Sequence, residues 1–279
     1  MKTSTQLKAL VRNLSKEKNV EAEIILRNFM LERLLERISI SNHRNNFILK
    51  GGMLIAAIVG IDTRTTMDLD ATIKAQILNE AEVTTIIDDI LSVPVDDNVI
   101  FTFKGIEEIH EEADYPGYRV SIEAVLDKTR QVLKVDITTG DFVTPREVQY
   151  YFKLMFEDRT ISIMAYNLET VLAEKFETVI TRGITNTRMR DFYDIYILTA
   201  TQPFDTNTFR TALKKTSEKR HTTSQMSDLE GVIQTVAASN VIVALWSRYQ
   251  KKYSYAADVT WEMAMDALKR LAVRINAGD

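Results

Sequence analysis

The residues with the clearest chemical potential lie in segment 47–74, where a glycine pair is followed by two aspartates. Gly51 and Gly52 come after a short apolar run, and Asp68 and Asp70 are separated by a single residue. If the second segment is a strand, residues i and i+2 share a face, so the two carboxylates would lie side by side. Two such charges repel each other. A divalent cation relieves that repulsion, and magnesium is typically held by one or two carboxylates together with substrate phosphates.

A third carboxylate occurs in the β-like run 132–137, where Asp136 alternates with Val135 and Ile137. The alternation places Asp136 on the face opposite the two apolar side chains. If this strand pairs near the first one, three carboxylates converge. Such a cluster suits phosphoryl transfer, in which metal ions bridge the attacking and leaving oxygens.

The glycine pair has a matching use. Gly51 and Gly52 would let the backbone approach a triphosphate closely, and a helix that begins there would direct its first amides at the phosphates. Thr65 or Thr66 could add a hydroxyl. Each motif alone is more often a turn or a pair of solvated aspartates, but their order along the chain favours the functional interpretation.

Composition excludes several other kinds of site. The chain of 279 residues has no cysteine, which rules out disulfides, iron–sulfur ligation and a cysteine nucleophile. His43, His110 and His221 are too scattered for a histidine-rich zinc site, so a metal would be held by carboxylates. With Lys+Arg 35 against Asp+Glu 39, the net charge of −4 does not fit a general DNA coat. No apolar stretch is long enough to span a bilayer, and we expect a cytoplasmic protein with no membrane partner.

Hydrophobic periodicity predicts the elements that must position these residues. Helices are expected at 4–14 and 19–38 and again from residue 167 onward, with a mixed section between them. The expected strands are 47–49, 67–73, 99–110, 118–127, 131–138 and 159–163, with helices at 52–59 and 79–91. The expected C-terminal helices are 167–182, 189–199, 206–218, 228–251 and 258–274. These patterns predict an α/β core domain over 1–160 and a helical domain over 161–279.

At this point the sequence resembles the nucleotidyltransferase superfamily, and within it the AbiEii/AbiGii-type toxins of abortive-infection and type IV toxin–antitoxin systems. Four motifs in order, within roughly 45–200, carry the resemblance. They are Leu49-Lys50-Gly51-Gly52 with Arg64-Thr65-Thr66-Met67-Asp68-Leu69-Asp70, then Lys134-Val135-Asp136-Ile137, then Ala173-Glu174-Lys175-Phe176 followed by Arg182, and last Arg188-Met189-Arg190-Asp191-Phe192-Tyr193-Asp194-Ile195-Tyr196. Many superfamily members have serine where this chain has Gly52, so a hydroxyl contact to phosphate is lost at that point.

The resemblance implies a nucleotidyltransferase-like α/β (α+β) fold, in which a mixed-sheet core has N-terminal helices and a C-terminal helical region. It implies Mg²⁺ or Mn²⁺ held by Asp68, Asp70 and Asp136. Lys175 would contact the nucleotide phosphates, and Asp191 would orient that lysine or the acceptor. The catalytic set is then Asp68, Asp70, Asp136, Lys175 and Asp191. The substrate-binding set is Gly51, Gly52, Arg64, Thr66, Arg182, Arg188 and Arg190.

A structural interpretation competes at the last two motifs, because Lys175 could simply lie on the solvated face of its helix. Arg188 and Arg190 at the start of the next helix argue against it, since cations are unfavourable at the positive end of a helix unless an anion is near. Phe192 and Tyr193 are expected to pack between helices.

The resemblance further implies a toxin that adds nucleotides from a nucleoside triphosphate to RNA, at the tRNA 3′ end, and thereby stops translation in phage defence. It implies an antitoxin encoded next to the toxin, without requiring a tight complex. Basic residues of the C-terminal helices could contact RNA phosphates or be ordinary solvated residues. They are Lys214, Lys215, Lys219, Arg220, Arg248, Lys251 and Lys252.

Two other functions stay open from the residues alone. The acceptor could be a protein side chain instead of RNA, which no sequence pattern here distinguishes. The chain could also be a nucleotide-binding module without turnover, because fold and metal binding do not by themselves ensure catalysis.

Overall fold

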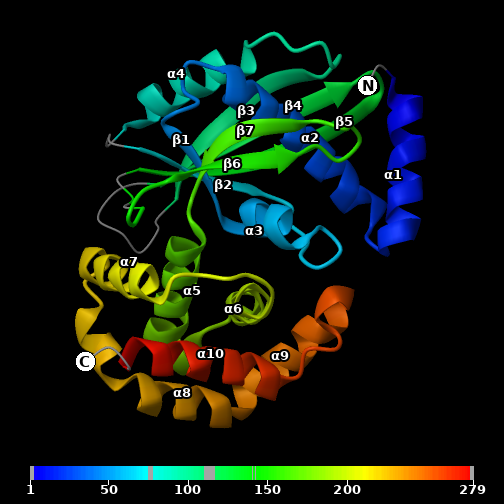
Figure 1. Ribbon diagram of the computed structural model, residues 1–279. Coiled ribbons are helices and arrows are strands. Elements are labelled where there is room, and N and C mark those ends of the chain that lie inside the picture. Colours follow the sequence, from blue (N-terminus) through cyan, green and yellow to red (C-terminus); the bar gives the residue numbers. More distant parts are fainter. Residues whose placement is uncertain (1–2, 75–77, 110–116, 140, 142, 277–279) are drawn as a thin grey trace. The chain divides into compact units, whose positions relative to one another are not determined.

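The computed structural model describes residues 3–74, 78–109, 117–139, 141 and 143–276, and the chain forms two compact units (Figure 1). The first unit comprises 1–141 and 147–166, and the second comprises 142–146 and 167–279. The expected boundary near residue 160 coincides with the start of a strand, and the units divide between Tyr166 and Asn167.

The first unit is built on a mixed sheet with the strand order β3-β4-β5-β2-β1-β7-β6. The strands are β1 Phe47–Lys50, β2 Leu69–Ile73, β3 Ile100–Ile109, β4 Gly117–Leu126, β5 Thr129–Thr139, β6 Val148–Lys153 and β7 Thr160–Ala165. The pairs β2–β5 and β1–β7 are parallel, and the other neighbours are antiparallel. The mixed α/β architecture expected from the sequence is therefore confirmed.

Strand β6 was not expected from the sequence. It lies at the edge of the sheet and pairs with β7 alone in the described structure, with exposed side chains such as Val148 and Tyr151. A strand at an edge needs less apolar alternation than a central one, so its local pattern is weak.

Helices α1 Ser4–Lys18, α2 Ala22–Ile40, α3 Gly51–Val59 and α4 Glu80–Leu91 accompany the sheet. Helix α2 contacts β5, β7 and α4, while α3 contacts β1 and β2 (Figure 1). Local sequence explains the starts of α1 and α4. The side chain of Thr3 caps α1, and Asn79 with Glu82 forms a reciprocal capping box at α4.

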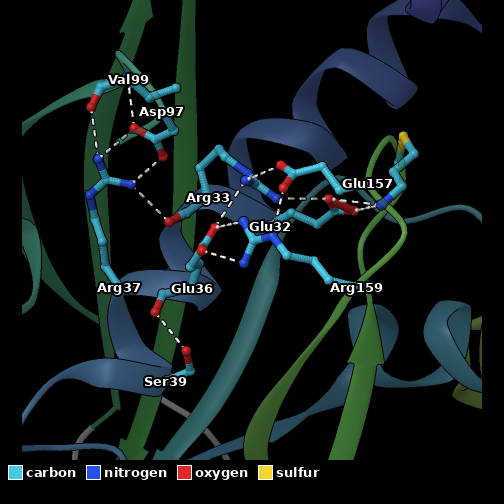
Figure 2. A network of polar contacts seen from close by, with 10 residues as sticks. Glu32, Arg33, Glu36, Arg37, Ser39, Asp97, Val99, Glu157 and Arg159 are labelled. Atoms are coloured by element: carbon cyan, nitrogen blue, oxygen red, sulfur yellow. Dashed lines mark hydrogen bonds and ion pairs between the residues drawn. The ribbon is translucent and has the colours of Figure 1, made fainter. Parts of the chain in front are cut away.

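Helix α2 carries a network of charged side chains that are largely buried (Figure 2). Arg37 binds Asp97, before β3, at 2.7 Å, and Arg159, in the turn between β6 and β7, binds Glu36 at 2.6 Å. The Glu32 carboxylate accepts hydrogen bonds from the backbone N–H of Met155 at 2.8 and 3.0 Å. These contacts connect α2 to the segment before β3 and to the turn between β6 and β7, at the two edges of the sheet. They also compensate the buried charges of the helix.

The central strands β2 and β5 place apolar side chains on a fully buried face, while on the opposite face Asp70 and Asp136 are partly exposed and Thr72 and Thr138 are buried. On β2 and β5 the register pairs Leu69 with Val135 and Ala71 with Ile137, and all four side chains are fully buried. The residues between them therefore point to the opposite face. The second face carries the site described below.

The second unit consists of α5 Leu168–Arg182, α6 Met189–Thr201, α7 Thr206–Lys219, α8 Leu229–Ala238, α9 Asn240–Lys252 and α10 Trp261–Asn276. Helix α6 contacts α5, α9 and α10 (Figure 1). The prediction of one helix over 228–251 is wrong. The chain breaks at Ser239, whose extended backbone and side-chain cap start α9 as a separate helix.

None of the described helices is long and apolar enough to cross a membrane alone. The bent pair Thr223–Ala238 and Asn240–Lys252 reaches the required length and composition only when its two parts are taken together.

Candidate active site

Four charged residues form a row across the open face of the sheet in the first unit. The register places Lys50 of β1 opposite Asp70 of β2, Asp70 beside Asp136 of β5, and Asp136 opposite Arg119 of β4. Directly paired residues of neighbouring strands have their side chains on the same face. The structure thus brings two of the three expected carboxylates together and flanks them with two cations.

Arg119 was not found from the sequence, and it binds Asp136 through two parallel hydrogen bonds. Nε and Nη2 donate to the two carboxylate oxygens at 2.8 Å each. The hydrogen bond to Asp136 raises the pKa of Arg119 above its ordinary value, against the effect of partial burial, and Asp68 adds to the rise through its charge. The guanidinium offsets part of the charge repulsion between Asp70 and Asp136.

Asp68 lies differently from the expectation. Strand β2 begins at Leu69, so Asp68 belongs to the bend before the strand and the alternation that pairs residues i and i+2 does not place its side chain. The bend is closed locally by the Thr66 hydroxyl, which donates to the Asp68 carbonyl at 3.1 Å. The expected strand 67–73 was too long at its start by two residues.

The glycine pair and Asp70 form one structural feature. Gly51 has φ +64°, and a Cβ on it would lie 2.0 Å from Oδ2 of Asp70. The N–H of Gly52 donates to the same Oδ2 at 3.1 Å. Position 51 must therefore be glycine for both its backbone conformation and its closeness to the carboxylate.

The Thr66 hydroxyl lies next to Gly52, the position at which many members of the superfamily have serine. A Cβ on Gly52 would lie 2.7 Å from the Thr66 hydroxyl, so a hydroxyl lies next to position 52 although the residue there is glycine. The Thr66 carbonyl accepts a hydrogen bond from Nδ2 of Asn28 at 2.8 Å, which holds this segment against helix α2. Asn28 gave no signal in the sequence, because nothing local indicates a contact across 38 residues.

Arg64 is buried beside the same glycine. Its Nη1 bonds to the carbonyl of Thr65, and its Nη2 lies 3.4 Å from where a Cβ of Gly52 would be. The side chain is 1% exposed. The structure places this expected substrate-binding residue against the backbone of the glycine motif.

The donor chemistry of this row fits a magnesium ion. Within the described ranges, no group of three His, Asp or Glu side chains is arranged to hold a metal ion. Asp70 and Asp136 supply two carboxylates, the number that magnesium typically takes from a protein beside substrate phosphates. A carboxylate has about four acceptor positions, and Arg119 occupies two of those on Asp136.

The second unit contains the expected lysine with two carboxylates. Nζ of Lys175 on α5 lies 2.8 Å from Asp191 and 2.8 Å from Asp194, both on α6. Asp194 is fully buried; it belongs to the fourth motif but was given no role from the sequence, although its spacing of three residues from Asp191 places both on one helix face. Lys175 is mostly buried, with 15% of its side chain exposed, so it does not lie on a solvated helix face.

The three expected arginines of this unit lie in different surroundings. Arg182 is the last residue of α5. Arg188 precedes α6 with an exposed side chain, and its backbone N–H donates to Asn186. Arg190 donates from Nη2 to the Tyr253 hydroxyl at 3.2 Å. Phe192, by contrast, is buried against Trp261, as expected for a packing residue.

The basic residues that could contact RNA phosphates or be ordinary solvated residues also differ in their surroundings. Arg220 is engaged with Glu177 of α5, which is buried, so it has a structural partner within the bundle. Arg248 and Lys252 on α9 are exposed.

Solved structures resemble this chain at low sequence identity. A Helicobacter pylori protein assigned as a nucleotidyltransferase aligns with a TM-score of 0.52 and 13% identity, over 93% of this chain and 99% of that chain. JHP933 from Helicobacter pylori aligns with a TM-score of 0.47 and 13% identity, over 92% of each chain. An antigenic nucleotidyltransferase-like protein from Paracoccidioides brasiliensis aligns with a TM-score of 0.37 and 15% identity, over 84% of this chain and 94% of that chain.

No protein of curated function matches this chain significantly. A family match, in contrast, covers most of its length. Residues 33–267 match the family described as nucleotidyl transferase AbiEii toxin of type IV toxin–antitoxin systems. The chain therefore belongs to the AbiEii family of nucleotidyl transferase toxins.

Proposed function

We propose that this toxin transfers a nucleoside monophosphate from a nucleoside triphosphate to the 3′ end of an RNA, with tRNA as the acceptor, in the cytoplasm. One observation carries the proposal. Asp70 and Asp136 are direct neighbours on parallel strands, and the Asp70 carboxylate is bonded to the glycine pair. Two carboxylates for a metal ion and the glycine pair of the first motif thus occur in one feature of the first unit.

In this proposal the residues of the first unit have distinct roles. Asp70 and Asp136 hold Mg²⁺ or Mn²⁺, with Asp68 as the third carboxylate of the motif. When bound by these residues, the ion would neutralise charge on the triphosphate and on the leaving pyrophosphate. Arg119 fixes the orientation of Asp136 through its two hydrogen bonds. An oxygen of Asp136 accepts the proton of the attacking 3′-hydroxyl.

The remaining motif residues bind the two substrates, the nucleotide and the acceptor. Gly51 and Gly52, whose backbone lies against the Asp70 carboxylate, belong to this set together with Thr66, whose hydroxyl lies beside Gly52. In the second unit Lys175 contacts phosphate oxygens as a compact cation, and Asp191 and Asp194 hold its ammonium in place. Arg182, Arg188 and Arg190 complete the substrate-binding set.

Membership of a type IV family implies an antitoxin partner. We propose that it is encoded beside the toxin and counteracts it without a tight complex. Modification of tRNA ends would stop translation in an infected cell, which accounts for abortive infection and phage defence.

The test is incubation of the purified protein with Mg²⁺, total bacterial RNA and each of four α-labelled nucleoside triphosphates. We expect one labelled band at tRNA length. Asp70→Asn and Asp136→Asn should each lower incorporation by about 100-fold or more. Asp96→Asn, an exposed carboxylate in the loop after α4, is the matched control and should keep full activity.

Other outcomes would redirect the assignment. Protease-sensitive label would mean a protein acceptor. Nucleotide binding without any transfer would mean a binding module. Equal incorporation by wild type and folded Asp70→Asn would overturn the proposed roles of the carboxylates.

A further inference from the structure

A cleft of about 490 Å³ lies within the second unit, between the start of α6 and helix α9. Its lining combines four cations with tyrosine rings. The cations are Arg188 and Arg190 from the start of α6 and Arg248 and Lys252 from α9. The rings are those of Tyr249 and Tyr253.

The positive charge of this cleft is not compensated by neighbouring acids. Across the described part of the chain, no carboxylate lies within 4.0 Å of the head groups of its four cations. Asp191 also lines the cleft, but its carboxylate is bonded to Lys175. Other cations of this unit behave differently, since Arg220 is paired with Glu177 and Lys269 with Asp266. A local surplus of positive charge on a chain of net charge −4 indicates an anionic ligand.

The rings make the cleft different from a simple phosphate site. Tyr253 packs 4.8 Å from the Tyr249 ring and 5.4 Å from the Tyr255 ring, by centroid distance. The guanidinium of Arg190 lies 5.7 Å from the centre of the Tyr253 ring, and Nζ of Lys252 lies 5.3 Å from it. Burial raises the pKa of Tyr253, but Arg190 and Lys252 outweigh it, so that the pKa lies below its ordinary value. The positive charges of Arg190 and Lys252 therefore act directly on the Tyr253 side chain.

Cations at the rim and aromatic rings inside are the combination that binds single-stranded nucleic acid, in which phosphates meet the cations and bases stack on the rings. Arg248 and Lys252 are four residues apart on α9 and so project from the same helix face, beside the exposed Arg188. Such a line of exposed cations suits the successive phosphates of a strand. The rings suit unpaired bases, because the bases of a duplex are stacked on each other.

We propose that this cleft binds the unpaired 3′-terminal nucleotides of the acceptor RNA, with Arg188, Arg248 and Lys252 on the phosphates and the Tyr253 ring against a base. The assignment rests on the proposed RNA acceptor and goes beyond it, because it locates the acceptor site and specifies a single-stranded end.

The experiment measures the affinity of the full chain for a fluorescent RNA hairpin with an unpaired 3′ overhang, for the same hairpin with a blunt end, and for the nucleoside triphosphates. The double variant Arg248→Ala/Lys252→Ala should weaken overhang binding by about 10-fold or more. Lys215→Ala/Lys251→Ala removes two exposed charges of the same unit outside the cleft lining and is the charge-matched control. Its affinity should stay within about twofold of wild type.

The ring is tested separately with two substitutions. Tyr253→Ala should weaken overhang binding by about 10-fold, whereas Tyr253→Phe keeps the ring and should retain most of the affinity. All variants are compared with wild type by thermal unfolding, so that a loss of fold is not read as a loss of binding. Affinity for nucleoside triphosphates should not change.

Several results would overturn the assignment. They are overhang binding unchanged in the folded double variant, equal binding of blunt and overhanging hairpins, no RNA binding by wild type, and a parallel loss of triphosphate binding. The last would mean that the cleft holds the nucleotide substrate.

The transfer assay separates this inference from the function on which it rests. If wild type labels RNA and the cleft variants bind and label RNA equally well, the cleft assignment fails alone. If the cleft binds overhanging RNA but no nucleotide is transferred, the proposed function fails and the binding site stands.

Discussion

At the scale of single residues, the contact between Gly51 and Asp70 is the most restrictive in the first unit. The φ of +64° and a Cβ position 2.0 Å from the Asp70 carboxylate both exclude a side chain. Gly51→Ala should displace the carboxylate and reduce nucleotide transfer by about 100-fold. It should also destabilise the fold by about 1–3 kcal/mol, the usual cost of backbone strain at such a position.

Gly105→Ala serves as the control for this substitution. A Cβ on Gly105, in β3, would meet no atom within 4 Å, so transfer should be unchanged. Incorporation of labelled nucleotide and urea unfolding measure the two effects. Full transfer by Gly51→Ala would show that the position of Asp70 does not matter for the reaction.

The pair of carboxylates at Lys175 makes a second prediction at this scale. Asp194 is fully buried and forms an ion pair with Lys175. Asp194→Asn therefore removes a partner charge at a place where water cannot solvate the lysine instead. We expect a loss of about 2 kcal/mol in the free energy of unfolding, less than for a pair broken completely, because Asp191 still binds the lysine. The more exposed Asp191→Asn should lose less stability. Urea unfolding of both variants measures the difference, and the reverse order would contradict this account.

At the scale of elements, the network on α2 contains a carboxyl group that titrates close to neutral pH (Figure 2). Burial raises the pKa of Glu32 from 4.5 to about 7, although Arg33 and the Met155 N–H act in the opposite direction. Between these two pH values the folded chain keeps a proton that the unfolded chain has lost. This group therefore stabilises the fold fully below about pH 4.5, and its contribution is lost as pH rises through about 7.

Glu32→Gln should remove this pH dependence. In wild type we expect the free energy of unfolding attributable to Glu32 to fall by about 3 kcal/mol between pH 4.5 and pH 7, and in the variant this slope should vanish. Arg159 and Arg33 lower the pKa of Glu157 despite its burial, which produces an opposite slope in more acid solution. Urea unfolding between pH 5 and pH 8 therefore isolates Glu32. Parallel curves for the two proteins would refute the assignment.

At the scale of the whole molecule, charge is distributed unevenly. The chain carries a net charge of −4, yet the cleft of the second unit collects four cations, none of which forms an ion pair with a carboxylate of the described residues. The logarithm of the RNA binding constant should fall linearly with the logarithm of the salt concentration. The slope should be about −0.7 for each phosphate contact in a single strand. Arg248→Ala/Lys252→Ala should lower the magnitude of this slope by about 1.4. Titrations at several KCl concentrations measure it, and an unchanged slope would place the phosphate contacts elsewhere.

The local pattern of the sequence predicted much of the fold. Alternation in 132–137 and in the segment before Ile73 indicated two half-buried strands, and both occur as β5 and β2. Apolar spacing of three and four residues indicated most helices. Both signals are local, since they depend only on which side chains share a face within one element. The four motifs in order were enough to indicate the family that the sequence match shows.

Only the tertiary structure decided which residues from different elements come into contact. The parallel pairing of β2 with β5 places Asp70 beside Asp136, and β4 supplies Arg119 from the other side. Asp194 joins Lys175 because α5 packs on α6. The edge strand β6 was missed because an edge strand needs little apolar alternation, and the break at Ser239 is a local helix cap within an otherwise continuous apolar pattern. Partners distant in sequence are selected by packing and strand order, which act across the whole domain, whereas periodicity records only how each element divides its faces between core and solvent.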